Sequence, residues 1–578
     1  MRIRASTTAL SLLLVAPGLW AGSAPLAAMQ GEPLVEDRIP EDVAAAIVDF
    51  YNDGATLRLA GPQRVAAGRS IVGDIAVLGG SLVVEGTVQG AVVVVNGDLR
   101  VAEGGRVEGD VVVVGGDAFG WQNGGVSGAV AVYRSRLRYR RSGDRIALRA
   151  SEPVTERLPD ALRFGRARLS VRSEDAYNRV EGLPLLFGPI LETAGERRFR
   201  LEAFAIWRSD NGFDPGDDDD FGFRVRAEQR LTRDGGLRLG VEARSQITPI
   251  ESWKVRDVET SLSTFLFRED MRDWVEREGW GAYLRYRSTA HGVGFGLAYR
   301  DDDFGFVEPG SPLTLRDNEA AWRPQPRVAR GSLRTLEGSI SYDTRNDEDD
   351  PTWGWLLRAR LTTGLGGDLA TPGEALVPPA GTLPPEGEGP ALETATDFTH
   401  AFVDLRRYLR LGPSSEVGVR GVFAGSLRDE ALPAQFQHAL GGQGTLPGLD
   451  RFALSCAARD GLIPLRVGDR VVEALPGYGC DRVWLLQLEV RQYADLDWEV
   501  GGGDDGPLVT FNPSWVAFAD VGAGESFTTV DEGFAGSDTR VAVDVGLGVY
   551  LGSLGVYWAL PVRGGSGSRV ILRLGRRF

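Results

Sequence analysis

The last 95 residues, from Trp484 to Phe578, alternate between apolar and polar side chains in short runs. Along residues 541–551 every second side chain is Val or Leu, and the side chains between them include an aspartate and two glycines. The same period of two recurs over residues 554–562 and again near the end, where the polar positions hold Arg569, Arg573 and Arg577. Strands of this kind fit a barrel whose outer face meets lipid and whose inner face meets water. The pattern therefore predicts a transmembrane β-barrel.

Similar alternating runs extend back to about residue 162 and complete this barrel. Sixteen runs are predicted to be strands: 164–171, 183–190, 201–207, 221–231, 237–244, 280–287, 293–299, 333–342, 355–363, 402–411, 417–423, 484–493, 515–521, 541–551, 554–562 and 570–578. The connections alternate between long and short, as external loops and periplasmic turns do. One connection, residues 494–513, is too long for a tidy periplasmic turn. An even strand number places both ends of the barrel in the periplasm.

The amino terminus has the organisation of an export signal. Two arginines precede an apolar run over residues 9–20, and small residues between Ala24 and Ala28 offer a cleavage site. No later run reaches the roughly 18 apolar residues of a membrane-spanning helix. We therefore predict a signal peptide and a location in the bacterial outer membrane, with outer-membrane lipids as partners of the barrel.

Residues 71–134 carry a different repeat. Gly73, Gly90, Gly109 and Gly128 recur at spacings of 17, 19 and 19 residues, and short apolar runs lie between them. Strands that repeat at this period around corner glycines predict a parallel β-solenoid. The repeats resemble those of the bactofilins, a polymer-forming bacterial cytoskeletal family. Self-association and a non-polymerising plug or spacer are both open for this solenoid.

The predicted fold class is all-β, a 16-stranded antiparallel transmembrane barrel preceded by a small parallel solenoid. An amphipathic helix over residues 40–52 is expected to cap the first rung of the solenoid. The predicted domains are a signal peptide (1–28), a short helix and cap (29–60), the periplasmic solenoid (61–140), a linker (141–161) and the barrel (162–578).

Charge and cysteine content narrow the function further. The net charge of -16 argues against nucleic acid as a partner, because phosphate contacts need clustered positive charge. The two cysteines, Cys456 and Cys480, lie in one predicted loop of an exported chain. A disulfide is therefore expected between them, with two unrelated thiols as the alternative.

Several motifs of the barrel resemble the bacterial surface antigen superfamily, which includes the outer-membrane assembly factor and the two-partner-secretion transporters. The main motif lies in the longest external loop, five strands before the end, where that superfamily carries a loop folded into the barrel; it contains Gly441, Gly442, Gly444, Pro447 and Gly448. Further matching segments are 342–345, 351–354 and 518–522, with weaker similarity at 177–182. The resemblance covers residues 330–578 and implies the barrel and its inward loop.

The chain departs from this superfamily at the loop. The family places an arginine just before the glycine equivalent to Gly448, and that arginine meets an acidic residue of a strand; here the position is Pro447. The predicted acidic anchors are present at the polar-facing Glu489 and Asp520. Two other residues are candidates for the missing cation, Arg451 and Arg491.

Enzymatic chemistry has little support in the sequence. The three histidines, His291, His400 and His438, form no spacing typical of a catalytic triad or a metal pair. Acidic clusters such as 301–303 lack the spaced ligands of a calcium loop. We predict neither an enzyme nor a metal or cofactor. A helix over residues 259–278 is expected to pack across the mouth of the barrel.

The predicted function is envelope biogenesis or the transport of a protein or lipid substrate. A structural anchor or scaffold acting through the solenoid is one alternative, and a passive pore is another. Superfamily members that handle unfolded proteins carry periplasmic domains of mixed helix and strand, and the segment before the solenoid is too short for one. Phe578 is the expected recognition end for the barrel-assembly machinery, with this chain as its client. The solenoid is the expected contact for a periplasmic partner or a second copy.

Overall fold

The computed structural model describes residues 34–36 and 39–578 apart from short gaps. The gaps of four or more residues are 149–161, 210–220, 317–321, 372–375, 378–391, 457–462, 494–497 and 528–538. The predicted signal peptide lies outside the described residues. Within the described part of the chain, no helix is both long and apolar enough to cross a membrane.

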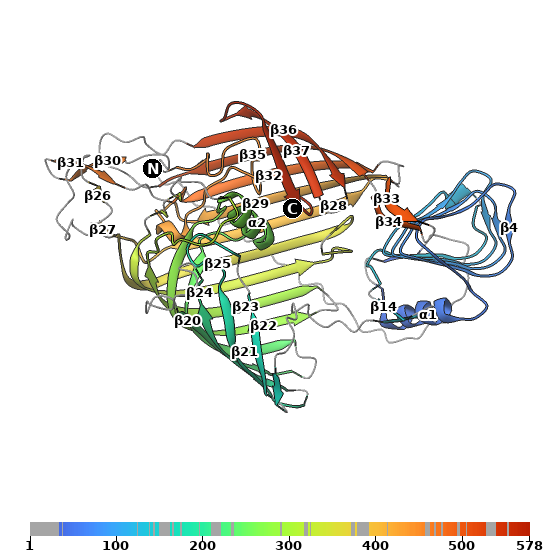
Figure 1. Ribbon diagram of the computed structural model, residues 1–578, viewed down its shortest axis with the longest axis horizontal. Coiled ribbons are helices and arrows are strands. Elements are labelled where there is room, and N and C mark those ends of the chain that lie inside the picture. The colour runs from blue at the N-terminus through green and yellow to red at the C-terminus, as the bar shows by residue number, and fades with distance from the viewer. Residues whose placement is uncertain are drawn as a thin grey trace, which may run out of the picture.

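The amino-terminal module is a parallel β-solenoid of three stacked sheets, drawn at the right of Figure 1. Its strands are β2 (Leu57–Ala60), β3 (Gln63–Val65), β4 (Ser70–Ile71), β5 (Ile75–Leu78), β6 (Leu82–Val84), β7 (Thr87–Val88), β8 (Val92–Val95), β9 (Leu99–Val101), β10 (Arg106–Val107), β11 (Val111–Val114), β12 (Ala118–Phe119) and β13 (Val130–Tyr133). Equivalent residues stack in register, as Ile75, Val92, Val111 and Val130 do. The repeat therefore sets one turn of the solenoid, as predicted.

The helix α1 (Glu41–Asn52) lies along the outside of this solenoid. Its Ala44, Ile47 and Tyr51 pack against the outward side chains of β5, β8, β11 and β13. The expectation that it caps the first rung is therefore wrong, because alternate residues of these strands, such as Ala76, are apolar on the outer face too and need a cover.

A hairpin follows the solenoid where a linker was expected. Strands β14 (Tyr139–Ser142) and β15 (Arg145–Leu148) pair, and Asn52 exchanges two hydrogen bonds with the backbone of Ile146. The first part of the predicted linker at 141–161 thus belongs to the amino-terminal module. A further strand, β1 (Leu34–Glu36), pairs in parallel with β13.

The barrel wall contains sixteen long antiparallel strands that correspond to the sixteen predicted runs. They are β17 (Ala167–Arg172), β18 (Leu185–Glu192), β19 (Phe199–Trp207), β20 (Phe221–Arg230), β21 (Leu237–Pro249), β22 (Trp274–Ser288), β23 (Val293–Gly305), β24 (Arg330–Asp343), β25 (Gly354–Thr371), β28 (Thr399–Arg410), β29 (Ser415–Ser426), β32 (Arg482–Tyr493), β35 (Pro513–Glu525), β36 (Arg540–Leu551), β37 (Leu554–Arg563) and β38 (Arg569–Leu574). Two short strands, β16 (Leu162–Phe164) and β27 (Leu392–Glu393), extend the same sheet beside β17 and β25.

The two faces of this wall differ as the alternation predicts. Large apolar side chains such as Leu297, Leu486 and Leu547 are more than half exposed on the outer face. Charged side chains such as Asp404 and Arg420 are almost fully buried on the inner face. An outer face of this composition is stable only against lipid.

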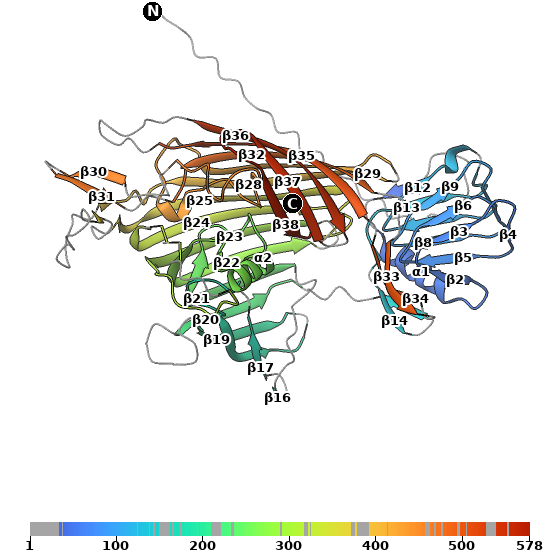
Figure 2. The same ribbon diagram turned by 45° about the horizontal axis from the view of Figure 1, so that its top comes forward.

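The connections differ at the two ends of the barrel. The unusually long connection after β32 contains an extra hairpin of β33 (Trp498–Gly503) and β34 (Gly506–Phe511), which lies at the end nearest the solenoid (Figure 2). The opposite end carries the longest loops and a small sheet of β26 (Leu376–Val377), β30 (Ile463–Val467) and β31 (Arg470–Ala474). We call these the solenoid end and the loop end.

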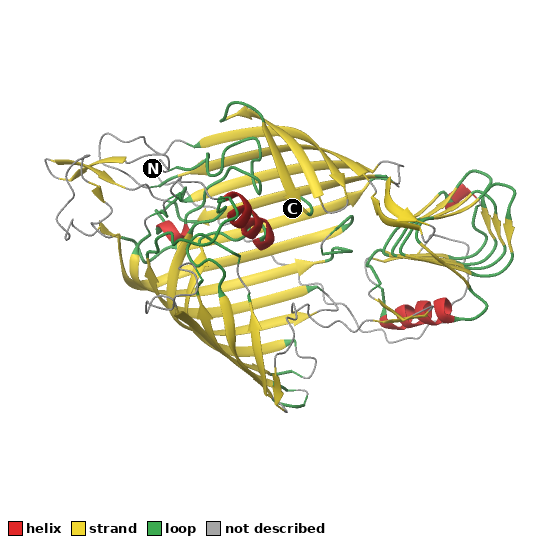
Figure 3. Ribbon diagram, in the orientation of Figure 1, coloured by secondary structure: helices red, strands yellow, loops and turns green. Residues whose placement is uncertain are grey.

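The helix predicted over residues 259–278 is shorter than expected. Helix α2 spans Asp257–Phe267, and Trp274 already begins β22. Figure 3 shows α2 as the helix drawn across the inner side of the barrel strands. The apolar positions Trp274 and Val275 fit a helical period, but they are buried under a loop at the end of the strand instead.

Candidate functional site in the barrel lumen

Residues 427–456 and 478–481 of the connection between β29 and β32 fold into the lumen, where the sequence motif predicts an inward loop. Its Leu440, Leu446 and Leu449 are almost fully buried and pack against Val422 of β29. Burying a leucine contributes about 2 kcal/mol. This apolar contact fixes the loop against strands β29, β32 and β36.

The glycines of the loop motif allow close backbone approach. Gly441 and Gly442 have φ of +120° and +84°, which other residues rarely adopt. The backbone N–H of Gly448 donates to Asp544 Oδ2 at 2.5 Å, and a Cβ on Gly448 would lie 2.8 Å from the Asp544 Cβ. At Gly444 a Cβ would collide with a backbone carbonyl of the neighbouring loop. The motif therefore lets the loop touch the wall through its backbone.

Two wall side chains bond to the backbone carbonyls on either side of Gly444. The amide of Gln487 donates to the carbonyl of Thr445 at 2.8 Å, and Arg573 donates to the carbonyl of Gln443 at 2.6 Å. Pro447 lies two residues after Thr445, so the loop is held next to this position without the arginine that the superfamily places there.

Neither candidate cation forms the expected lock between the loop and the wall. Arg451 donates to the carbonyl of Asp270 at 2.7 Å and lies 3.3 Å from the carboxylate of Glu269, so it ties its loop to a second loop. Arg491 lies on the wall itself and pairs with Glu489 at 2.9 Å and with Glu416 at 3.5 Å.

The acidic anchors are occupied by the end of the chain instead. Arg577 pairs with Asp520 and lies 4.0 Å from Glu489. Both carboxylates are buried in the lumen. The prediction that these two carboxylates anchor the inward loop is therefore wrong, because the segment that reaches them comes from beyond the last strand.

The segment after β38 turns into the lumen. Gly575 has φ of +80° at the turn, and Arg576 then pairs with Glu416 at 2.7 Å and with Asp350. The Tyr408 hydroxyl donates to the carbonyl of Phe578 at 2.8 Å. The alternating pattern predicted Phe578 on the strand, and this is wrong because the strand ends before the glycine.

A buried carboxylate that the sequence did not single out joins the connection of residues 250–273 to the inward loop. Glu251 follows β21 and accepts hydrogen bonds from four side chains and one backbone N–H: Trp253 Nε1 (3.0 Å), Lys254 Nζ, His438 Nδ1 (2.7 Å), Tyr478 Oη (2.5 Å) and the N–H of Ala439 (3.4 Å). Burial tends to raise the pKa of Glu251, but the Lys254 ammonium and the His438 ring outweigh it and hold the pKa at about 2. The carboxylate therefore stays charged.

Arg179 fixes a third internal connection, from the weakly matching segment at 177–182. Its guanidinium is fully buried and pairs with Asp273 at 2.8 Å and Asp270 at 3.2 Å. Arg451 bonds to the backbone of Asp270, in the connection after α2. The connection before β18, the connection after α2 and the inward loop are thus linked by arginine contacts.

Helix α2 is attached to the last strand. Its Glu259 accepts a hydrogen bond from the Arg573 guanidinium at 2.8 Å and another from the backbone N–H of Leu574 at 2.9 Å. Among the described residues no pairing joins β38 to β16 or β17, so the sheet has two free edges. The helix therefore covers part of one of these edges from inside the barrel.

Cys456 and Cys480 form a disulfide across the inward loop. Cys480 pairs by backbone hydrogen bonds with His438, and its side chain is buried against β35. The bridge joins Cys456 to the short segment that also supplies Tyr478 to the Glu251 cluster.

The solenoid contacts turns at its end of the barrel. Arg410 at the end of β28 pairs with Asp98 at 2.9 Å, and Arg136 lies 3.5 Å from Asp347 in the turn between β24 and β25. The Arg134 guanidinium lies 3.8 Å above the Trp353 ring. These polar contacts seat the solenoid beside the barrel mouth.

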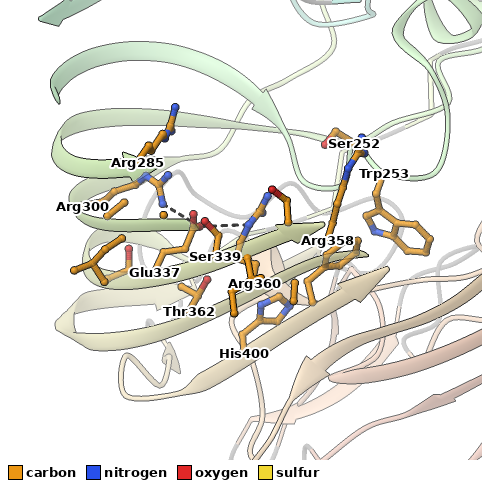
Figure 4. Close-up of a pocket in the computed structure, with 18 of the residues that line it drawn as sticks. Ser252, Trp253, Arg285, Arg300, Glu337, Ser339, Arg358, Arg360, Thr362 and His400 are labelled. Atoms are coloured by element: carbon orange, nitrogen blue, oxygen red, sulfur yellow. Dashed lines mark hydrogen bonds and ion pairs between the residues drawn. The ribbon is translucent and has the colours of Figure 1, made fainter. Parts of the chain in front are cut away.

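A cavity of about 940 Å³ remains between the inward loop and the wall of β21–β28 (Figure 4). Its lining includes seven arginines and three glutamates. His400 reaches this cavity, and its Nε2 lies 2.8 Å from the Nε2 of His438. Across the described residues, no group of three or more His, Cys, Asp or Glu side chains is placed to hold a metal ion.

No protein-family model matches this chain, and no curated protein matches it by sequence. Solved structures with a similar fold include BamA from Haemophilus ducreyi lacking POTRA domains 1-3, at 13% identity with a TM-score of 0.41 over 72% of this chain and 75% of that one. CdiB from Escherichia coli matches at 12% identity with a TM-score of 0.31, over 76% and 66% of the two chains. The ferric enterobactin receptor PfeA of Pseudomonas aeruginosa matches at 11% identity with a TM-score of 0.29, over 68% and 62%.

At these identities and TM-scores the likenesses carry no argument for this chain, and the strand assignment rests on the pairing described above. The chain is an all-β protein in which a parallel β-solenoid precedes a 16-stranded antiparallel β-barrel.

Proposed function

We propose that this protein is a gated outer-membrane barrel of envelope biogenesis, which moves a protein or lipid substrate when its internal plug is displaced. The plug consists of residues 250–273, the inward parts of the loop (427–456 and 478–481) and the segment 575–578. The single observation that carries the proposal is the Glu251 cluster, which holds the first two of these together inside the lumen. A passive pore would not require a link between segments inside its lumen.

The attachment of α2 to β38 supports passage of a substrate that involves the sheet edge. Glu259 bonds to the backbone of the last strand, so movement of the plug would alter the same sheet edge, which pairs with no strand in the described part of the chain. A bulky or amphipathic substrate benefits from an opening in the wall, whereas a small solute needs only the lumen. The proposal includes no catalytic step.

The proposed orientation places the solenoid in the periplasm and the long loops outside the cell. In this orientation the solenoid lies where a substrate or a periplasmic partner would arrive, and its contacts with Arg410 and Asp347 are largely polar. The barrel itself would be a client of the barrel-assembly machinery. A polymerising scaffold is less favoured, because β1 already pairs with the terminal strand β13.

Gene deletion with quantitative comparison of the outer-membrane proteins and lipids tests this function. We expect a selective loss or mislocalisation of one component, and the wild-type gene should restore it. Photo-crosslinking from solenoid surface positions, such as the exposed Arg64, should capture the same component. An unchanged membrane composition with altered uptake of small solutes would contradict the proposal and favour a passive pore.

A further inference from the structure

The lumenal side of strands β22–β25 carries a regular arrangement of arginine, glycine and serine. Arg285 on β22 is in register with Gly296 on β23, Gly296 with Ser339 on β24, and Ser339 with Arg360 on β25. One row across four strands therefore has an arginine at each end and two small residues between them.

The neighbouring row repeats this arrangement. Arg287 is in register with Gly294, Gly294 with Ser341, and Ser341 with Arg358. Strands lie about 4.8 Å apart and residues on one face about 7 Å apart, so the four arginine Cα atoms mark a rectangle of about 14 by 7 Å. All eight residues of the two rows line the cavity. We call them the arginine floor.

The centre of the arginine floor is flat and polar. A Cβ on Gly294 would lie 2.5 Å from the hydroxyl oxygen of Ser341, and a Cβ on Gly296 would approach that of Ser339 more closely still. Larger residues would therefore occupy the space above the serines. The hydroxyls are hydrogen-bond donors for a group held between the arginines.

The charge of the floor is poorly compensated. Among the described residues no carboxylate forms an ion pair with Arg285, Arg287 or Arg358. Arg360 lies 3.6 Å from Glu337, but more than half of its side chain is exposed and Arg300 shares the same carboxylate at 3.0 Å. Like charges held close together in a confined site attract anions strongly.

We propose that the arginine floor is a binding site for a compact polyanion with two or more phosphate groups, such as a phosphorylated sugar. Guanidinium groups bind phosphate through paired N–H donors, and four of them around a serine centre match a ligand with several such groups. The cavity of about 940 Å³ is large enough for a phosphorylated ring. The ligand is either free in solution or the headgroup of a lipid. The site is present with the plug in place, so it does not depend on transport.

Calorimetry on the full-length protein in neutral detergent at 0.15 M NaCl tests this site, with inositol hexakisphosphate as the probe and myo-inositol as the uncharged control. The double variant Arg285→Gln/Arg287→Gln should weaken hexakisphosphate binding by about tenfold for each guanidinium removed. The matched control Arg428→Gln/Arg563→Gln removes the same charge from exposed positions and should bind like the wild type. Equal affinity in all three proteins, or no binding to the wild type, would overturn the proposal.

A steric pair of variants tests the same site without a change in charge. Gly296→Val places methyl groups over Ser339 and should abolish binding. Gly338→Val, on the outer face of the next strand, meets open space and should leave binding intact. If the double arginine variant does not fold, Arg358→Gln and this pair decide the question.

The source of the ligand is resolved by reconstitution. Wild-type protein in phosphatidylcholine nanodiscs, with or without cardiolipin, is titrated with the hexakisphosphate. Competition by cardiolipin that disappears in Arg358→Gln assigns the site to a lipid headgroup, and unaffected binding assigns it to a soluble polyanion. Competition that persists in Arg358→Gln would show that cardiolipin acts elsewhere, and the site would then be assigned to the soluble polyanion.

Discussion

The arginine floor differs in charge pairing from the half of the lumen that faces it and from neighbouring ion pairs on its own strands, such as Arg300–Glu337. On the side of β28–β38, buried carboxylates and arginines are paired with each other or with the plug, as Asp404 is with Arg420 at 2.8 Å. On the side of β22–β25, three arginines face a cavity without a carboxylate partner among the described residues. Both walls are built from the same alternating strands.

Paired charges and unpaired arginines have different roles in the lumen: the first keep it closed and the second can bind a ligand. An ion pair that is buried on both sides fixes a conformation, because loss of either partner leaves an uncompensated charge. An unpaired arginine that faces water fixes nothing and remains available to a ligand. The paired half therefore accounts for the closed lumen, and the arginine floor accounts for its capacity to bind.

Removal of the Glu251 carboxylate should have the largest effect on the paired half. Glu251→Ala leaves the buried Lys254 ammonium without its partner and should lower the free energy of unfolding by about 3 to 5 kcal/mol. Denaturant unfolding in detergent measures this change. The rim variant Glu269→Ala removes a largely exposed carboxylate and should change the stability by less than about 1 kcal/mol. Equal effects of the two variants would contradict the tether.

The same carboxylate predicts an acid dependence. The pKa of Glu251 is about 2 in the folded protein, below its ordinary value of 4.5. Its contribution to stability is therefore complete above about pH 4.5 and is lost as the pH falls toward 2. The difference in unfolding free energy between the wild type and Glu251→Gln should shrink over this window, and a constant difference would contradict it.

Loss of the disulfide should have the next largest effect. The double variant Cys456→Ser/Cys480→Ser opens a loop closed over a separation of 24 residues and should cost about 3 kcal/mol by the chain-entropy model. Alkylation without reductant should label neither thiol of the wild type. Reduction should give the wild type the stability of the variant, and ready labelling without reductant would contradict the bridge.

Loss of the Arg577–Asp520 ion pair, which releases residues 575–578, should lower the free energy of unfolding by a smaller amount. Arg577→Gln removes the partner of Asp520 and should lower the unfolding free energy by about 2 kcal/mol. The exposed Arg563→Gln is the control. A spin label at Phe578→Cys should then report increased mobility in the Arg577→Gln background. Unchanged mobility would show that other contacts hold the segment.

The contact between solenoid and barrel should show the smallest effect. Burial, more than the opposing attraction of Arg410, raises the pKa of Asp98 above 3.8, so its charged form is a net cost to the folded state. Asp98→Asn should therefore be neutral or stabilising by less than about 1 kcal/mol at pH 7. The difference should vanish as the pH falls below 3.8. A clear destabilisation at pH 7 would show that the ion pair dominates.

The wall of the barrel was predictable from the sequence because the pattern of each strand depends only on neighbouring residues. Alternation with a period of two, as at residues 541–551, reports which side of a strand meets lipid. The solenoid was predictable for a similar reason, since each turn repeats the same short pattern. Helix α1 was placed at the wrong surface because its apolar side fits either the end or the outer face of a solenoid.

The plug was only partly predictable, because its contacts join distant residues. The glycine motif indicated an inward loop, and Glu489 and Asp520 were recognised as lumenal acids. Their partner Arg577 was not predicted, because the alternating pattern does not show that the chain turns at Gly575. Glu251 carries no local signal at all, and its partner His438 lies 187 residues away.

Single-channel recording in planar bilayers tests the closed, tethered lumen most directly. Wild-type protein should show little steady conductance, whereas Glu251→Ala should open to large and fluctuating current levels because the buried central tether between its two loops is lost. Glu269→Ala should behave like the wild type. A wild-type barrel that conducts steadily, with no further increase in Glu251→Ala, would contradict the gate.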